Sequence, residues 1–440
     1  MVSDDPSSTR RAVLRGGLLA TLGLAGCIDR QDADAPAGGG DERPTGDAVR
    51  WTRQTGGSVR NRPTVEDDIV YVGAGTNDNA TSDRDHVRPE RSENVYAIAA
   101  DDGSQQWRYE APAGVASSPV VGDGVYVIAG WSAGTHGIKQ RLVRIDDGSE
   151  TWTTESRDRF LHLLDSTGDT AYLGTSDDEL GVTGEKLFAI RASDGDQRWS
   201  IEVGDTTSAA VYDDTLYAVE GTRRTTALAV SDGSERWHRD MRPATHEPRL
   251  FGDTMYLESE QKNEAGNYPV IAVSSADGSE RWRFSAPVDE PFVPTGAVQS
   301  DDMVFITEYG GWLFGVDSSD GTEHWRYSTD GDTRDAPVVV GSTVCVSTIT
   351  GNVHAVDAAT GDRQWKRTVP EQPSIVAGNP QALVVRGGKE EESQQLRAYA
   401  PDGTERWSFS HDGGLTLPAV EGTRAVVGTD SGYVAALAEE

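Results

Sequence analysis

Side chains that could perform acid–base, nucleophilic or metal chemistry are scattered through this sequence. None of its 8 His residues forms the His-x-x-x-His or HExxH spacing that brings two imidazoles to one metal ion. No G-x-S-x-G elbow, P-loop or Rossmann fingerprint precedes a helical pattern. Cys345 stands alone in the β-rich run from Thr343 to Thr348, so we interpret it as a small buried hydrophobic residue rather than a nucleophile. These patterns predict no catalytic residues.

One acidic group, formed by Asp330, Asp332 and Asp335, offers the oxygen donors that Ca²⁺ prefers. Acidic residues are so abundant, however, that such groups arise without any metal. The chain has 72 Asp and Glu against 40 Lys and Arg, and its formal net charge is -32. We therefore interpret the three aspartates as a solvated loop, and we predict no metal site.

The net charge limits the partners of the protein and indicates its source. Such an acidic body repels nucleic-acid phosphates and anionic membrane surfaces, so neither is expected to bind it directly. Self-repulsion destabilises the chain at ordinary ionic strength, whereas in about 1 M salt the Debye length falls to roughly 3 Å and screens that repulsion. The composition therefore favours a halophile, and specifically a haloarchaeon, over an acidic mesophile.

The first 27 residues have the pattern of an export signal that ends at a lipid attachment site. Arg10 and Arg11 resemble a twin-arginine signal, and they precede an apolar stretch, Gly16 to Ala25, that is too short to span a membrane as a mature helix. The stretch closes on Leu-Ala-Gly-Cys27, which resembles a lipobox. We predict that residues 1–26 are a signal peptide and that Cys27 carries the lipid. An uncleaved N-terminal anchor helix is the alternative.

The segment that follows has almost nothing to bury. Residues 28–48 are rich in Asp, Ala, Gly and Pro, a composition that is typical of disordered chain. As a flexible coil the segment has a root-mean-square reach of roughly 25 Å. We therefore predict that residues 27–48 are a tether, and that the protein is exported and held at the outer face of the cell membrane by its lipid alone.

A repeat in the rest of the sequence determines the strands and turns on which any site must lie. At 8 places a Gly is followed four residues later by a Trp, and the residue before that Gly is Asp in 7 of them and Thr360 in the other. Asp-Gly supplies the positive φ of a tight hairpin turn. A Trp on the next strand buries about 150 to 250 Å² of surface. We therefore expect each Trp to dock one repeat unit against its neighbour.

Between successive tryptophans lies a further hairpin-like pair of strands, so each unit has four strands. Without helical periodicity, this predicts an all-β fold, a β-propeller of four-stranded blades over residues 49–440. A small residue before a larger apolar one marks every unit except that of Arg144-Ile145; examples are Ala355-Val356 and, in the fourth unit, Ala229-Val230. The predicted docking residues are Trp51, Trp107, Trp152, Trp199, Trp237, Trp282, Trp325, Trp365 and Trp407.

The number of blades follows from the two ends of the chain. Trp51 lies on a strand of the type that follows the Asp-Gly turn of the repeat. Residues 432–438 have the pattern of the strand that precedes that turn. Together they make one blade from both termini, which closes the ring and removes an exposed sheet edge. Nine units are counted in this way. Because propellers usually have four to eight blades, eight is the alternative.

Two loops exceed the repeat. Residues 76–93 contain Asn79-Ala80-Thr81, a glycosylation sequon that is usable outside the membrane. Residues 131–140 begin with Trp131, which, like Trp312, is outside the docking series. We favour local packing of this Trp, and a partner contact through an exposed aromatic on the loop is the alternative.

The stretch from Val353 to Trp365 resembles the tryptophan-docking repeat of the pyrroloquinoline quinone (PQQ)-like propellers, and the resemblance runs from Trp51 to the C-terminus. It implies one of two roles. Quinoprotein dehydrogenases hold PQQ and a Ca²⁺ ion ligated by Glu, Asn and Asp in the central channel, use an Asp base and often have an adjacent Cys pair. The other branch includes the scaffold lipoprotein of the bacterial outer-membrane barrel-assembly machine.

The adjacent Cys pair is absent, because the only two cysteines are Cys27 and Cys345. We therefore expect a non-catalytic, monomeric propeller without a cofactor, anchored outside the membrane, that acts as a scaffold and binds a protein or small ligand at one face. A PQQ-dependent dehydrogenase is the alternative.

Overall fold

Each repeat of the sequence folds into one four-stranded antiparallel sheet. In the blade of residues 338–368, the second and third strands are rich in β-branched residues and are buried almost throughout. The outermost strand, Arg363–Thr368, is exposed apart from the buried Trp365 and the half-buried Lys366. This is the pattern of a strand that covers the edge of a sheet with one side in water.

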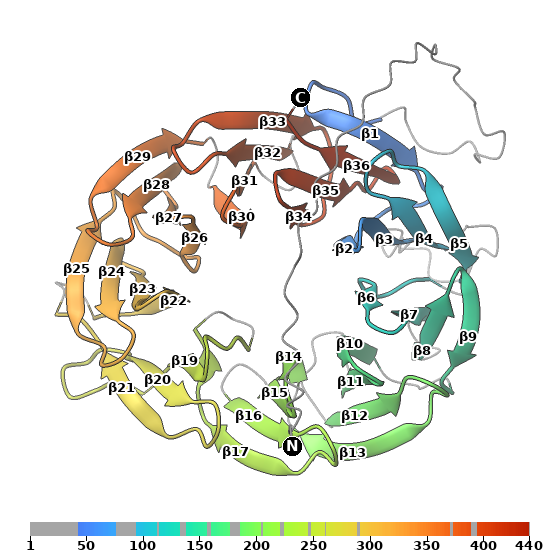
Figure 1. Ribbon diagram of the computed structural model, residues 1–440, viewed down its shortest axis with the longest axis horizontal. Helices are drawn as coiled ribbons and strands as arrows, with labels where there is room; N and C mark the ends of the chain where they lie inside the picture. The colour runs from blue at the N-terminus through green and yellow to red at the C-terminus, as the bar shows by residue number, and fades with distance from the viewer. Residues whose placement is uncertain are drawn as a thin grey trace, which may run out of the picture. The chain divides into compact units, whose positions relative to one another are not determined.

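The computed structural model describes residues 43–75, 94–111, 114–132, 138–155, 160–176, 185–203, 206–220, 224–244, 248–259, 261–287, 291–369, 373–388 and 394–439. These residues form 36 strands and no helix. The strands group into nine four-stranded sheets, which are the blades of a ring (Figure 1). The predicted all-β propeller of nine blades is therefore confirmed, and the alternative of eight blades is wrong.

The blades are numbered along the chain, each from its innermost strand outward. Blades 1 to 5 consist of β2 Thr64–Glu66, β3 Ile69–Ala74, β4 Asn94–Ala99 and β5 Gln105–Glu110; β6 Val120–Val121, β7 Val125–Ser132, β8 Ile138–Asp146 and β9 Ser149–Thr153; β10 Phe160–Thr167, β11 Thr170–Ser176, β12 Glu185–Arg191 and β13 Gln197–Val203; β14 Thr206–Tyr212, β15 Thr215–Glu220, β16 Arg224–Ala229 and β17 Glu235–Arg239; β18 Arg242–Pro243, β19 Thr254–Glu258, β20 Val270–Ser274 and β21 Glu280–Phe284. Blades 6 to 8 consist of β22 Pro294–Ser300, β23 Met303–Glu308, β24 Trp312–Asp317 and β25 Glu323–Ser328; β26 Val338–Val340, β27 Thr343–Thr348, β28 Asn352–Asp357 and β29 Arg363–Thr368; β30 Ser374–Gly378, β31 Leu383–Gly387, β32 Gln394–Tyr399 and β33 Glu405–His411.

Blade 9 is built from both ends of the chain, as the sequence predicted. Its strands are β34 Ala419–Glu421, β35 Arg424–Gly428, β36 Tyr433–Leu437 and, outermost, β1 Val49–Gln54. β1 pairs with β36 in antiparallel register, with Trp51 opposite Ala436. The ring is therefore closed by backbone hydrogen bonds between the two ends of the chain (Figure 1).

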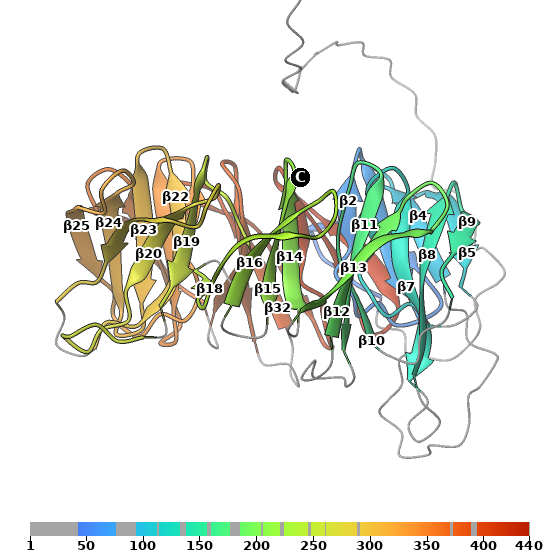
Figure 2. The ribbon, with the colours of Figure 1, turned by 90° about the horizontal axis from the view of Figure 1, so that it is seen from below.

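The antiparallel order gives the ring two different faces (Figure 2). The connections from first to second strand and from third to fourth strand lie on one face, which we call the turn face. The connections from second to third strand and from each blade to the next lie on the opposite face, which we call the loop face. Because every blade has the same direction, each face repeats the same type of connection around the ring.

The hydrophobic core is divided among the interfaces between neighbouring blades. One cluster joins Val353 and Trp365 of blade 7 to Leu383 and Tyr399 of blade 8. Comparable clusters recur around the ring, and that of blades 8 and 9 includes Trp407 and Leu437. Each blade is therefore stabilised through its two neighbours, as in other repeat architectures.

The register corrects one prediction in blade 4. Ala227, rather than Ala229, lies opposite Trp237, and a bulge follows between Ala227 and Leu228. Ala229 instead pairs with Thr215 at the end of its strand. The docking position is set by register with the Trp, so a second alanine two residues further along was mistaken for it.

Within the part of the chain described above, no helix is long and apolar enough to cross a membrane.

Candidate functional site

The predicted docking tryptophans all lie on the outermost strand of their blades. At eight of the joints, the ring of the Trp lies against the Gly of the next blade. Gly321, for example, has φ +74°, and a β-carbon there would lie 2.7 Å from Cε3 of Trp282. Only glycine satisfies both the left-handed backbone and the close contact.

A hydrogen bond from the indole N–H to the next blade also orients this joint. Nε1 of Trp282 donates to the carbonyl of Ser318 at 2.8 Å, and Nε1 of Trp51 donates to the carbonyl of Ala100 at the same distance. In each pair the acceptor precedes the docking glycine by three residues. The Gly-Trp contact therefore fixes the distance between two blades, and the hydrogen bond fixes their angle.

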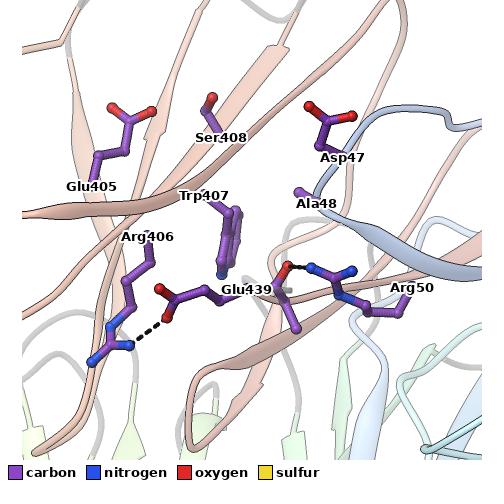
Figure 3. Close-up of a pocket in the computed structure, with 9 residues that line it drawn as sticks. Asp47, Ala48, Arg50, Glu405, Arg406, Trp407, Ser408 and Glu439 are labelled. Carbon is purple, nitrogen blue, oxygen red and sulfur yellow. Dashed lines mark hydrogen bonds and ion pairs between the residues drawn. The ribbon is translucent and has the colours of Figure 1, made fainter.

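The joint between blades 8 and 9 departs from this arrangement. Trp407 has no docking glycine beneath it, because the turn that would supply one is divided between the two ends of the chain. It packs with Ala48 instead, and its Nε1 donates to the carbonyl of Thr423 at 3.3 Å. A cleft of about 330 Å³ opens beside it (Figure 3).

The cleft at the closing joint contains charges of both signs. Arg406 contacts Glu439 at 2.6 Å, and Arg50 donates to the carbonyl of Ala438 at 2.8 Å (Figure 3). Asp47 and Glu405 also line the walls. The arginines are already paired with protein acceptors, so the cleft is a gap left by ring closure rather than a built ligand site.

Two of the three aspartates considered for Ca²⁺, Asp330 and Asp335, bind protein groups. Asp330 accepts a hydrogen bond from Asn352 at 2.9 Å and contacts Nε2 of His354 at 2.8 Å. Asp335 accepts hydrogen bonds from Ser347 and Ser374. Across the described residues, no group of three or more His, Cys, Asp or Glu is arranged to hold a metal.

Asp330 is the centre of a polar network between blades 6 and 7. His354 is buried, and its two ring nitrogens contact Tyr327 of blade 6 and Asp330. Burial lowers the pKa of His354. Burial alone would raise the pKa of Asp330, but hydrogen bonds from Lys366 and His354 outweigh it and lower the pKa to about 2. The network joins blade 6 to blade 7.

Two buried glutamates were missed by the sequence analysis. Glu258 and Glu308 end the second strands of blades 5 and 6 on the loop face, and each leaves one carboxylate oxygen without a partner. Burial raises the pKa of Glu258 to about 7 despite its ion pair with Arg242. Burial also raises the pKa of Glu308, although the backbone N–H groups of Gly310 and Val293 oppose that rise. The sequence signal that could have identified them is a Glu at the last position of the second strand in two neighbouring blades.

The turn face is rich in aspartates, and arginines such as Arg198, Arg236 and Arg281 pair with some of them. Asp102, for example, has its pKa lowered by hydrogen bonds from Ser104. The pKa of Asp214 is lowered to about 2, mainly by a hydrogen bond from Arg236. The described turns contain ten such aspartates with lowered pKa: Asp102, Asp169, Asp194, Asp214, Asp232, Asp253, Asp277, Asp317, Asp357 and Asp402. This face therefore carries a ring of ionised aspartates.

The loop face has a different character. Tyr309 is 45 % exposed and Leu417 is 49 % exposed, and these are the only exposed large hydrophobic side chains in the described residues. Tyr309 follows β23, and Leu417 precedes β34, so both lie on the loop face. Neither stood out in the sequence, because exposure of a loop residue depends on its tertiary neighbours.

The structure describes the side chains of Cys345 and Trp312, two further residues that the sequence analysis considered. Cys345 is buried, and burial raises the pKa of its thiol to about 12, as expected for an inert side chain. Trp312 is half-buried and stacks on Phe314 of its own strand, so it packs locally. Cys27, Arg10, Arg11 and Asn79 lie outside the described residues, and so does the side chain of Trp131.

The solved structures that resemble this propeller include a natural and a designed protein. BamB from Moraxella catarrhalis is 17% identical with a TM-score of 0.50, and the match covers 72% of this chain and 95% of that one. The computationally designed Ika8 protein is 11% identical with a TM-score of 0.53, and the match covers 87% of this chain and 96% of that one. At these identities the likeness shows the fold alone.

Sequence comparison goes further. The outer membrane protein assembly factor BamB of Moranella endobia (strain PCIT) is 26% identical over 315 residues, which are 69% of this chain and 75% of that protein. The family model described as outer membrane protein assembly factor BamB matches residues 73–284 and 266–390. These matches run through blades 1 to 8 of the propeller, and the chain belongs to the BamB family of PQQ-like β-propellers.

Proposed function

We propose that this protein is a non-catalytic scaffold that binds another protein through the loop face of its propeller. The observation that carries the proposal is the difference between the two faces. One is a ring of ionised aspartates, whereas the other has the two exposed large hydrophobic side chains of the described residues, Tyr309 and Leu417. Exposed apolar groups with a polar surround are typical of protein interfaces. Membership of the BamB family supports a binding role, since the named relatives are assembly factors.

Site-specific photo-cross-linking in cells tests this proposal. A photoreactive amino acid at Tyr309 samples the loop face, and one at Ala276, an exposed residue in a docking turn of blade 5, samples the turn face. We expect cross-linked species from position 309 and none from position 276. Equal yields at both positions, or none at either, would contradict a loop-face scaffold.

We further propose that the scaffold is exported and lipid-anchored, with Arg10 and Arg11 as the export signal, Cys27 as the lipidated residue and residues 27–48 as the tether. Residues 43–48 reach β1 from the turn-face end, because β1 takes the place of a fourth strand. Replacement of Cys27 by Ser should release the protein from the membrane fraction, and replacement of both arginines by Lys should keep it inside the cell. Membrane retention of the Cys27 variant would favour the uncleaved anchor.

A haloarchaeal source is part of the same proposal. The net charge of -32 and the aspartate-rich turn face require screening by salt. Thermal stability should therefore rise between about 0.1 M and 2 M KCl. A flat or falling stability over that range would exclude a halophilic adaptation.

The loop that contains Asn79 is exported in this scheme, and we propose it as a glycosylation site. Intact mass of the native protein and of an Asn79→Gln variant tests the assignment. A difference equal to the amino-acid change alone would exclude a glycan at that position.

The quinoprotein alternative is not favoured by the described residues. A Ca²⁺–PQQ centre needs several carboxylate or amide oxygens that converge on one point. Asp330 and Asp335, two of the three residues considered for Ca²⁺, are instead hydrogen-bonded to protein groups. Dye reduction over a panel of alcohols and sugars, with PQQ and Ca²⁺ added, should give no turnover. Turnover above the protein-free control would restore the enzyme alternative.

A further inference from the structure

The docking turns of blades 1 and 2 have the same tetrapeptide, Asp-Asp-Gly-Ser, but different lengths. In blade 1, six residues separate the paired positions Ile98 and Gln105 that flank the turn. In blade 2, four residues separate the corresponding pair, Ile145 and Glu150. The same four residues therefore lie in two different backbone conformations, and the turn of blade 2 is the shorter one.

The longer turn of blade 1 holds both groups of its Asp-Gly pair. The N–H of Gly103 donates to the carbonyl of Ala99 at 3.0 Å, and the carboxylate of Asp102 accepts from the N–H of Ser104 at 2.8 Å. Comparable pairs of hydrogen bonds hold five further Asp-Gly turns, whose aspartates are Asp194, Asp232, Asp277, Asp320 and Asp402. In these six turns the Asp side chain and the Gly nitrogen are fixed apart from each other.

The shorter turn of blade 2 holds neither group. Asp147 and Gly148 have φ +48° and +78°, as in the two-residue hairpin turns that require positive φ at both positions. The pairing in such a turn joins the flanking residues, Asp146 and Ser149. Within the described part of the chain, the N–H of Gly148 and the exposed carboxylate of Asp147 have no hydrogen-bond partner.

The joint at this turn also lacks one contact that other joints have. A β-carbon at Gly148 would lie 2.9 Å from Cβ of Trp107, so the turn packs closely on blade 1. The indole acceptor at a regular joint lies three residues before the docking glycine, and here that residue is Ile145, already inside the strand. Nε1 of Trp107 has no hydrogen-bond acceptor among the described residues. The joint of blades 1 and 2 therefore depends on the packing of Trp107 against the turn.

We propose that Asp147-Gly148 is a site of self-modification, at which the chain forms a succinimide and then an isoaspartate. The nitrogen of Gly148 attacks Cγ of the Asp147 carboxyl group, a C–N bond forms, and the carboxyl hydroxyl leaves as water with the amide proton. Water then opens the five-membered ring at the original main-chain carbonyl, so that the chain continues through Cβ and Cγ. Neither step needs an oxidant, a metal ion or a second protein.

The structure selects this turn and gives the reaction a consequence. Glycine has no side chain to hinder the attack, and the missing hydrogen bonds leave the nitrogen and the carboxyl group free to approach each other. The isoaspartate adds one carbon to the main chain of the turn. Gly148 then cannot keep its contact with Trp107 while β8 and β9 keep their register. The modification therefore loosens the joint of blades 1 and 2.

Storage of the folded protein in the salt that stabilises it tests the site. Peptide mapping by chromatography and mass spectrometry follows both Asp-Asp-Gly-Ser segments in one sample. A succinimide appears as the loss of one water, and an isoaspartate as a shifted retention time at unchanged mass. We expect conversion at Asp147 to be about tenfold faster than at Asp102, because two hydrogen bonds must open at Asp102. Equal rates, or no conversion at Asp147, would overturn the proposal.

The unfolded chain is the matched control for sequence. Because the two segments share one tetrapeptide, denaturant should free both and bring their conversion rates together. A preference for Asp147 that persists in denaturant would assign the difference to the sequence around the turn and not to its structure.

Two variants test the effect on the joint. Asp147→Glu keeps the charge but cannot form the five-membered ring, so its unfolding free energy should stay constant during storage. That of the wild type should fall in step with conversion at Asp147. Asp102→Glu alters the held turn and should lose stability during storage as the wild type does. Equal losses in Asp147→Glu and the wild type would contradict a weakening of the joint by isoaspartate.

Discussion

The joint that closes the ring and the joints elsewhere in it differ in one component. Between blades 5 and 6, Trp282 rests on Gly321 and its indole donates to Ser318 at 2.8 Å. Between blades 8 and 9, Trp407 is equally buried but lacks the glycine, and its hydrogen bond to Thr423 is 3.3 Å long. The difference shows that regular docking needs a glycine turn on the neighbouring blade as well as the Trp.

That turn forms only where the chain runs without interruption from the third strand of a blade to the fourth. Where blade 9 is divided between the two ends, β1 and β36 still pair, but no turn joins them to present a glycine. The cleft beside Arg406 is the result (Figure 3). The opposite side of the same blade is regular, since Trp51 rests on Gly103 of blade 1. Ring closure therefore weakens one joint and leaves its neighbour intact.

Truncation of the two tryptophans gives the largest expected effects. Trp282→Ala should destabilise the protein by about 4 kcal/mol, in the range for a buried Trp. Trp407→Ala should cost about 1 kcal/mol less, because the glycine contact is already absent and the hydrogen bond is longer. Denaturant unfolding of both variants measures the difference. A loss at Trp407 as large as that at Trp282 would show that the closing joint is held as tightly as the others.

The contact between glycine and Trp at a regular joint can be tested separately from the left-handed backbone of the glycine. Gly321→Ala should destabilise by about 3 kcal/mol, because left-handed φ costs an alanine about 1 to 2 kcal/mol and the contact with Trp282 adds overpacking. Gly252 also has positive φ, at +62°, but has nothing within 4 Å of its β-carbon position. Gly252→Ala is therefore the control and should cost about 1 kcal/mol. Equal losses would mean that the Trp contact contributes nothing.

The joint of blades 6 and 7 has a polar network that the closing joint lacks. Asp330→Asn should destabilise by about 2 kcal/mol at pH 7, because it weakens charged hydrogen bonds to Lys366 and the buried His354. The folded pKa of Asp330 is about 2, below its ordinary 3.8, so its contribution is full above pH 3.8 and is lost as the pH falls through about 2.

Unfolding free energies of wild type and Asp330→Asn at pH 7 and pH 3 check this sign. The difference between the two proteins should shrink at the lower pH. Asp302, in the turn between β22 and β23, is exposed and serves as the control position, where Asn should have little effect at either pH. A difference that grows on acidification would contradict the assignment of Asp330 as an ionised centre.

The sequence determined the repeated elements well because they obey a local rule. Gly and Trp at fixed spacing specify a turn and a docking side chain, and both ends of blade 9 could be recognised as halves of that unit. The rule failed at Ala229 because two alanines lie in the same strand and only the cross-strand register distinguishes them. At Arg144 the small residue is replaced by a long one, which donates to the carbonyl of Asp123 instead of making room for the Trp.

The candidate site could not be predicted in the same way. Leu417 is exposed on a loop whose Thr416 meets Val59 at Gly428, and these two residues are 357 positions apart in the chain, so only ring closure brings their loops together. Glu258 and Glu308 have acidic side chains that the sequence alone would place in water. Their burial depends on how neighbouring blades cover the ends of the second strands. Sites of this kind arise from the arrangement of blades, which the repeat specifies without naming the residues that it brings together.

The ion pair of the closing joint gives the smallest expected effect. Arg406 and Glu439 are 2.6 Å apart, but 26% and 51% of their side-chain surfaces are exposed. A pair so exposed contributes less than about 1 kcal/mol and is screened by salt. Arg406→Gln should therefore change the unfolding free energy by less than that amount, and the change should vanish in about 1 M salt. A loss of 2 kcal/mol or more that persists in salt would mean that the pair, and not the β1–β36 ladder, holds the ring closed.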